Sequence, residues 1–210
     1  MTDWVRETRV SYDTVAVSYA DMLRDALAGE PFQRGILGLF AEVVRALPVG
    51  PVADVGCGPG RICGFLRERG LDVFGIDLSP GMVAVARREF PGVRFEVGSM
   101  TGLELADGSL AGLLAWFSLI HVPDDEVPGV LAEFRRVLRP GGVLLLGFHA
   151  GDGVRWKSEG YGGHPMNVYV HRRPAARVAG WLRDAGFTVE AELVHRPEPN
   201  VEGAFVFANR

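Results

Sequence analysis

Hydrophobic and polar positions along this chain follow two alternating patterns, which predict buried strands and amphipathic helices. Short, mostly apolar runs with the composition of interior parallel strands occur at 52–55, 71–77, 93–97, 110–117 and 143–148. Apolar residues three or four positions apart predict amphipathic helices at 32–47, 61–69, 80–90, 124–138 and 174–185. A strand–helix alternation repeated five times predicts an α/β fold built on a doubly wound sheet.

The rest of the chain departs from this alternation. Residues 3–28 have one long helical pattern, with a break expected near Ser11. Residues 150–168 show neither period and are rich in glycine, so we expect a long loop there, with a short strand at 168–171. Segments 187–194 and 203–209 alternate apolar and polar positions, which predicts an antiparallel hairpin at the sheet edge.

Size, charge and cysteine content narrow the class of protein. A chain of 210 residues with 48% hydrophobic and 23% charged residues suits one globular domain. The net charge of −4 offers no general attraction to nucleic acid or to an anionic membrane. Residues 1–7 lack the basic start and apolar core of a signal peptide. Cys57 and Cys63 have neither C-x-x-C nor metal-ligand spacing, so we expect reduced thiols in a cytoplasmic protein.

A glycine-rich turn follows the strand at 52–55. Gly56, Gly58 and Gly60 alternate with other residues, and a helical pattern begins at Arg61. A strand, a turn without side chains and a helix N-terminus together form a cradle for a nucleotide. Arg61 stands where a dinucleotide fingerprint has its third glycine, and Asp54 would repel a pyrophosphate. This spacing favours a ligand whose near end is cationic.

Four segments resemble class I S-adenosylmethionine (SAM)-dependent methyltransferases of the small-molecule type. Residues 54–60 are similar to motif I of that family, D-x-G-x-G-x-G. Residues 12–20 resemble its Y-D-x-x-A-x-x-Y segment, and residues 116–123 resemble the segment after its fourth strand, with Ile120 in place of the first histidine. Residues 133–148 resemble its R-x-L-x-P-G-G element. The resemblance covers residues 12 to about 148 and implies a Rossmann-like seven-stranded sheet with helices on both faces and the last strand reversed.

The same resemblance implies the cofactor SAM, with S-adenosylhomocysteine (SAH) as product. Asp77 ends the second strand, 21 residues after Gly56, where a carboxylate would accept hydrogen bonds from ribose hydroxyls. An N-cap role for Asp77 is the alternative, but Ser79 and Pro80 already provide the cap and the first-turn proline. The other motif residues expected to contact the cofactor are Asp54, Gly56, Cys57, Gly58, Gly60, Arg61, Leu78 and Met82.

Six further residues, in three pairs, are expected near the cofactor and have alternative interpretations. Tyr12 and Tyr19 share a helix face and either cover the methionine end of SAM or pack on the core. Ser99 and Met100 correspond to a G-D-M element beside the adenine, although Ser99 replaces the usual Asp and Met100 also suits the core. Trp116 and Phe117 either form a wall of the cofactor pocket or are core aromatics.

We expect one domain over 1–210. It divides into capping helices (1–47), a cofactor-binding core (48–148), a substrate lid (149–173) and a C-terminal helix with hairpin (174–210).

The expected reaction is an SN2 methyl transfer to a small-molecule acceptor, with no nucleic acid or membrane partner and no metal. Positioning and exclusion of water carry most of such a reaction. Should the acceptor lose a proton, His121 is the first candidate base, followed by His164 and His171, and a surface or hydrogen-bonding role is the alternative for each. The alternatives for the whole protein are an NAD(P)-dependent oxidoreductase and a non-catalytic SAM-binding module. It could be a monomer or a homodimer.

Overall fold

The computed structural model describes residues 3–198 and 201–210 of the chain. Residues 1–2 of the predicted capping segment, and residues 199–200 of the predicted hairpin connection, lie outside the described residues. In chain order the elements are α1 Asp3–Leu23, α2 Pro31–Arg45, β1 Val52–Val55, α3 Arg61–Glu68, β2 Val73–Asp77, α4 Pro80–Glu89, β3 Arg94–Val97, β4 Leu110–Trp116, the 3₁₀ turn η1 Leu119–His121, α5 Val127–Val137, β5 Leu138–His149, β6 Gly153–Gly160, β7 His164–Arg172, α6 Ala175–Asp184, β8 Thr188–Glu198 and β9 Val201–Asn209.

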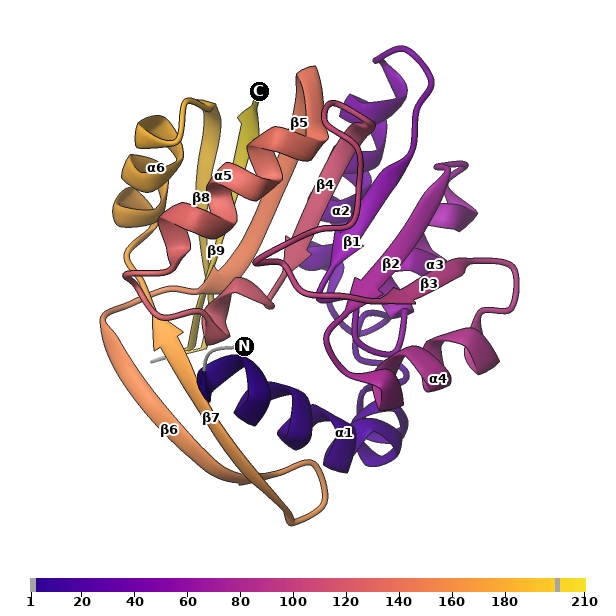
Figure 1. Ribbon diagram of the computed structural model, residues 1–210, viewed down its shortest axis with the longest axis vertical. Helices are drawn as coiled ribbons and strands as arrows, with labels where there is room; N and C mark the ends of the chain where they lie inside the picture. The colour runs from indigo at the N-terminus through magenta and orange to yellow at the C-terminus, as the bar shows by residue number, and fades with distance from the viewer. Residues whose placement is uncertain (1–2, 199–200) are drawn as a thin grey trace.

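The centre of the molecule is a seven-stranded sheet in the order β3-β2-β1-β4-β5-β9-β8 (Figure 1). Strands β1 to β5 pair in parallel, and β9 lies antiparallel between β5 and β8. The predicted α/β class, the seven strands, the C-terminal antiparallel hairpin and the reversed last strand are therefore confirmed.

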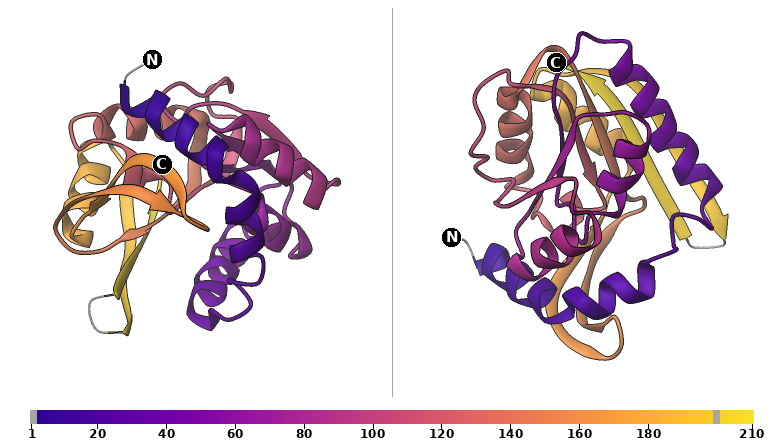
Figure 2. Two further views of the ribbon diagram at one scale, coloured as in Figure 1. Left: turned by 90° about the horizontal axis from the view of Figure 1, so that it is seen from below. Right: turned by 90° about the vertical axis from the view of Figure 1, so that its right-hand side faces the viewer.

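Helices cover both faces of this sheet because its central strands are apolar on both sides. In β5, Leu144 and Leu146 point into the core beneath α5 and α6, whereas Val143 and Leu145 point into the core beneath α2, α3 and α4. Helix α1 and the β6–β7 hairpin lie across the carboxyl ends of the strands, where they contact each other (Figures 1 and 2). That edge is where open α/β sheets bind ligands.

One of the five predicted strand–helix repeats is wrong. Residues 98–109, between β3 and β4, contain no helix. The loop lies on the α5 face, where Arg136 donates hydrogen bonds to the carbonyl oxygens of Leu103 (2.9 Å) and Leu105 (2.7 Å) and to Asp107 (2.6 Å). Leu103 is buried in the core there. The loop therefore covers this part of the sheet in place of a helix. Its carbonyl groups accept hydrogen bonds from α5.

The predicted loop at 150–168 is also wrong, because most of it forms the β6–β7 hairpin. Met166 and Val168 alternate along β7 and are buried against α1. On the opposite face of the hairpin, Val154 and Trp156 are each 57% exposed. Because apolar residues occur on both faces, the sequence does not show the alternation of apolar and polar residues that would predict a strand. The predicted strand at 168–171 is part of β7.

Three predicted boundaries need correction. Helix α1 runs through Ser11 without a break, because the Ser11 hydroxyl accepts a hydrogen bond from Asn167 N (2.8 Å) and leaves the helix intact. Helix α5 begins at Val127 rather than at Asp124, whose carboxylate instead pairs with Arg173 at 2.9 Å. Strand β5 begins at Leu138, before the predicted turn. None of the helices within the described residues is both long and apolar enough to cross a membrane.

Candidate active site

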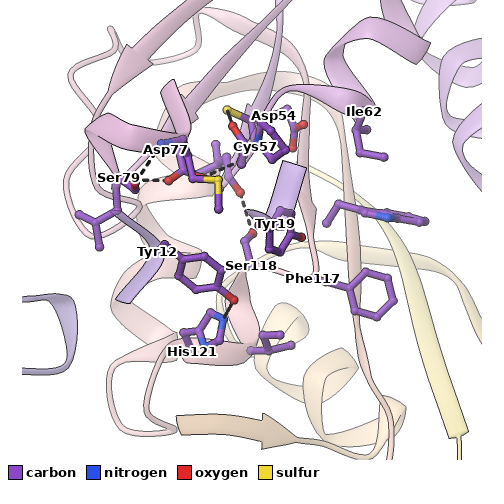
Figure 3. Close-up of a pocket in the computed structure, with 18 of the residues that line it drawn as sticks. Tyr12, Tyr19, Asp54, Cys57, Ile62, Asp77, Ser79, Phe117, Ser118 and His121 are labelled. Carbon is purple, nitrogen blue, oxygen red and sulfur yellow. Dashed lines mark hydrogen bonds between the residues drawn. The ribbon is translucent and has the colours of Figure 1, made fainter. Parts of the chain in front are cut away.

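A cavity of about 430 Å³ lies at the carboxyl ends of β1, β2 and β4, beneath α1 and the β6–β7 hairpin (Figure 3). Most residues singled out from the sequence line it, although they come from seven helices and strands and from the loops between them. The predicted residues that line this cavity are Tyr12, Tyr19, Asp54, Gly56, Cys57, Gly58, Arg61, Asp77, Leu78, Met82, Ser99, Met100, Trp116, Phe117 and His121.

The other three predicted site residues lie outside it. A Cβ at Gly60 would come within 2.7 Å of Phe95, so packing requires this glycine. His164 is the exposed first residue of β7. His171 Nδ1 lies 3.7 Å from Asp124 Oδ1 and belongs to a different, small pocket. Of the three candidate bases, only His121 reaches the cavity.

Asp77 joins the glycine turn to the end of β2. Its Oδ2 accepts a hydrogen bond from Gly58 N at 2.7 Å, and its Oδ1 accepts one from Ser79 N at 2.9 Å (Figure 3). Ser79 Oγ caps α4 by accepting from Met82 N at 3.0 Å, as the sequence predicts. Burial raises the pKa of Asp77 to about 6, against the lowering effect of the two backbone donors. Each carboxylate oxygen keeps acceptor capacity for a ligand hydroxyl.

Beside the glycine turn, one acidic and one basic side chain each have a buried atom without a hydrogen-bond partner among the described residues. Asp54 is fully buried, and its Oδ2 accepts from Cys63 Sγ at 3.5 Å. Among the described residues, Asp54 Oδ1 and Arg61 Nε are buried without a hydrogen-bond partner. Burial raises the pKa of Asp54 to about 7. Buried polar atoms are nearly always satisfied, so these two require a ligand or ordered water.

Tyr12 and His121 close the cavity on the side of α1. His121 Nδ1 lies 2.9 Å from the carbonyl oxygen of Tyr169, which can only accept, so Nδ1 carries the hydrogen. His121 Nε2 then accepts from the Tyr12 hydroxyl at 2.7 Å. Burial lowers the pKa of His121 to about 4 and raises that of Tyr12, so both are neutral near pH 7. The pair fastens α1 to the segment after β4.

We expect Tyr12→Phe to lower the free energy of unfolding by about 1–3 kcal/mol, because it leaves the buried Nε2 of His121 without a donor. Urea denaturation measures this change. Tyr169→Phe is the matched control, since its ring is 50% exposed and the structure gives its hydroxyl no hydrogen bond within the described residues. Equal stability of the two variants would show that the Tyr12–His121 hydrogen bond does not hold α1.

Aromatic rings form the walls between these polar groups. Tyr19 packs edge-on against Tyr161 at 4.5 Å between centroids, and Phe117 lies 5.1 Å from His149. Phe117 and Tyr161 have φ of 53° and 49°, and they are the non-glycine residues with left-handed φ among the described residues. Both line the cavity. Such strained backbone costs about 1–3 kcal/mol per residue and is concentrated at functional sites.

Sequence reasoning missed Ser118, His149 and Tyr161. Ser118 Oγ donates to the Val55 carbonyl at 2.7 Å and ties the end of β4 to β1. His149 ends β5, so the rule that ligands bind at carboxyl strand ends would have found it. Tyr161 lies in the turn between β6 and β7, and no local signal marks it, because only the folded hairpin brings it to Tyr19.

Comparison with known proteins agrees with this geometry. Residues 52–142 match the family model described as a methyltransferase domain. The demethylmenaquinone methyltransferase of Renibacterium salmoninarum is 35% identical over 140 residues, which are 67% of this chain and 57% of that protein. The malonyl-[acyl-carrier protein] O-methyltransferase of Serratia marcescens is 37% identical over 136 residues, covering 65% and 52%.

A solved structure shares the fold over the whole chain. The magnesium protoporphyrin IX methyltransferase from Synechocystis PCC 6803, crystallised with bound SAM, superposes with a TM-score of 0.73 at 19% identity, covering 100% of this chain and 98% of that one. The chain spans about half the length of the curated relatives it matches. This chain therefore belongs to the methyltransferase family, and its fold is that of the SAM-dependent class I methyltransferases.

Proposed function

We propose that this protein transfers a methyl group from SAM to a small-molecule acceptor. The observation that carries this proposal is the pair of unsatisfied buried atoms, Asp54 Oδ1 and Arg61 Nε, beside the glycine turn. One is an acceptor on an acid and the other a donor on a base, which suits the ammonium and carboxylate of an amino acid. A pyrophosphate, by contrast, would leave Asp54 facing a second anion.

The residues of the cavity fit the rest of that cofactor. Asp77 would hold the ribose hydroxyls, Ser99 and Met100 would lie beside the adenine, and Tyr12 and Tyr19 would cover the methionine end. Gly58 leaves free the space that a side chain would occupy, since a Cβ there meets nothing within 4 Å. When bound, SAM would supply an activated methyl group on a positively charged sulfonium.

The protein's own residues would orient the acceptor and exclude water. Helix α1, fastened by the Tyr12–His121 hydrogen bond, covers the cavity and keeps bulk water from the reacting atoms. His121 gives its free nitrogen to Tyr12, so it would act as a base through the Tyr12 hydroxyl rather than directly. His164 and His171 would need the hairpin to move before they could act as bases.

The finer statements about partners and location are part of the same proposal. The acceptor is a small molecule rather than nucleic acid, as the net charge of −4 favours. The protein is cytoplasmic, consistent with two free buried cysteines, and is a monomer or a homodimer.

Equilibrium dialysis against labelled SAM and labelled NAD tests the cofactor. We expect SAM to bind and NAD not to bind; the reverse result would favour an oxidoreductase.

Incubation of a metabolite extract with methyl-labelled SAM tests the reaction. We expect a labelled small molecule, whereas tight SAM binding without any labelled product would favour a non-catalytic SAM-binding module.

We expect SAM affinity to rise between pH 5 and pH 8. Burial raises the pKa of Asp54 to about 7 and of Asp77 to about 6, yet both must be ionised to bind ammonium and ribose. In the ligand-free protein, the stability that comes from their protonated forms is complete below about pH 4 and is lost as the pH rises through these values. When SAM binds, its positive charge stabilises the ionised carboxylates and so offsets this loss of stability.

Isothermal titration calorimetry with SAM at several pH values measures this dependence. Asp54→Asn is the control, and it should flatten the part of the profile near pH 7. An affinity that stays constant from pH 5 to pH 8 would contradict the roles given to both carboxylates.

A further inference from the structure

The β6–β7 hairpin turns one face toward the body of the protein, and that face carries positive charge. Residues directly opposite each other in an antiparallel ladder point to the same face. Arg155 is opposite Val170, and Lys157 is opposite Val168. Val168 is buried against α1, and Val170 packs against the main core. Arg155 and Lys157 therefore extend from the inner face of the hairpin.

Lys157 ends beside a residue that lines the cavity, and Arg155 is within electrostatic reach of another. Lys157 Nζ lies 3.8 Å from the centroid of the Tyr161 ring. Burial lowers the pKa of His149, at the end of β5, and the positive charges of Arg172, Arg155 and Lys157 lower it further. Burial and the charge of Arg155 likewise lower the pKa of Lys157. Positive groups from β6 and β7 thus gather around the neutral imidazole of His149 at one corner of the cavity.

No acid of the described residues balances Arg155 and Lys157. Neither forms an ion pair within that part of the chain. The acids lining the cavity are Asp54, Asp77 and Glu30, and none of them shifts the pKa of His149 or Lys157. Like charges that repel one another in a partly desolvated corner lower the stability of the fold unless an anion offsets them.

We infer that the methyl acceptor carries an anionic group, such as a carboxylate, phosphate or sulfonate, which binds between His149 and the Arg155 and Lys157 side chains of the hairpin. This inference rests on the proposed function, because it treats this corner as the acceptor side of the same cavity. Phe117, 5.1 Å from His149, would contact the apolar part of the acceptor. The anionic group would then lie away from the acids that hold the cofactor.

A matched pair of fluorescent probes tests this. 1-Anilinonaphthalene-8-sulfonate and N-phenyl-1-naphthylamine share their rings but differ in the sulfonate. We expect the SAH-saturated protein to bind the sulfonate about tenfold more tightly than the neutral amine, as a charge-assisted contact would give. Lys157→Met and Arg155→Met should each remove most of that preference without changing affinity for the neutral amine. Lys157→Arg should keep it.

Arg88→Met, on the exposed surface of α4, is the control for a general loss of positive charge. Because Arg155 is exposed, Arg155→Met keeps the test decisive even if Lys157→Met fails to fold. Equal affinities for the two probes, or a preference that Arg155→Met leaves unchanged, would overturn the inference. SAH binding is measured first: its absence contradicts the proposed function, whereas SAH binding without a sulfonate preference contradicts only the anionic acceptor.

Discussion

Gly58→Val is expected to weaken SAM binding by at least about 100-fold while the protein stays folded. A Cβ at Gly58 meets nothing within 4 Å, so the added side chain would project into the cavity and not into the core. The residue has φ of 54°, which costs a β-branched side chain about 1–3 kcal/mol of stability. Calorimetric titration with SAM and a thermal melt measure the two effects.

Gly56→Ala is the matched comparison in the same turn. A Cβ at Gly56 would come within 2.2 Å of Ser118 Cβ, so this substitution should disrupt the fold itself. We therefore expect Gly56→Ala to lower the melting temperature more than Gly58→Val does, although its side chain is smaller. Retained SAM binding by a folded Gly58→Val protein would show that the glycine turn is not the cofactor cradle.

Asp77→Ala is expected to weaken SAM by roughly 2–4 kcal/mol, which is about 30- to 1000-fold in affinity. The substitution removes two acceptors for ribose hydroxyls and also the anchor of Gly58 N. Asp77→Asn keeps one carbonyl acceptor and should give an intermediate loss. Titration calorimetry measures all three proteins.

A double-mutant cycle separates the ribose contact from the support of the turn. SAH and its 2′-deoxy analogue are bound to the wild type and to Asp77→Ala. If Asp77 contacts the ribose, removing the 2′-hydroxyl should cost the wild type affinity and the variant little. The same loss in both proteins would reject the ribose role and leave Asp77 as a support of the glycine turn.

Much of the fold could be predicted because its central strands carry a local signal. Strands such as β1 and β4 are buried on both faces, so each is a short apolar run bounded by turn residues. The β3–β4 connection was mispredicted for the opposite reason. Its packing depends on Arg136 and Glu133 of α5, about 30 residues away, and no period within 98–109 records that contact.

The candidate site divides in the same way. Asp54 and Asp77 could be located because carboxyl ends of parallel strands meet at one edge, and their distance from the glycines can be counted along the chain. His171 could not be judged by such counting, because the twist and register of the hairpin decide which of its side chains face the cavity. The same hairpin turns Lys157 inward.

The sequence by itself determined the α/β class, the glycine turn and the strand-end acids, because each depends on residues close together in the chain. Tertiary structure alone decided that Tyr12 meets His121 across 109 positions, and that the turn of the hairpin places Tyr161 on Tyr19. The physical reason is that burial and pairing satisfy side chains only after distant segments pack. The cover of the cavity therefore forms only when α1 and the β6–β7 hairpin pack together. The part of the cavity formed by the strand ends and the glycine turn follows from local sequence.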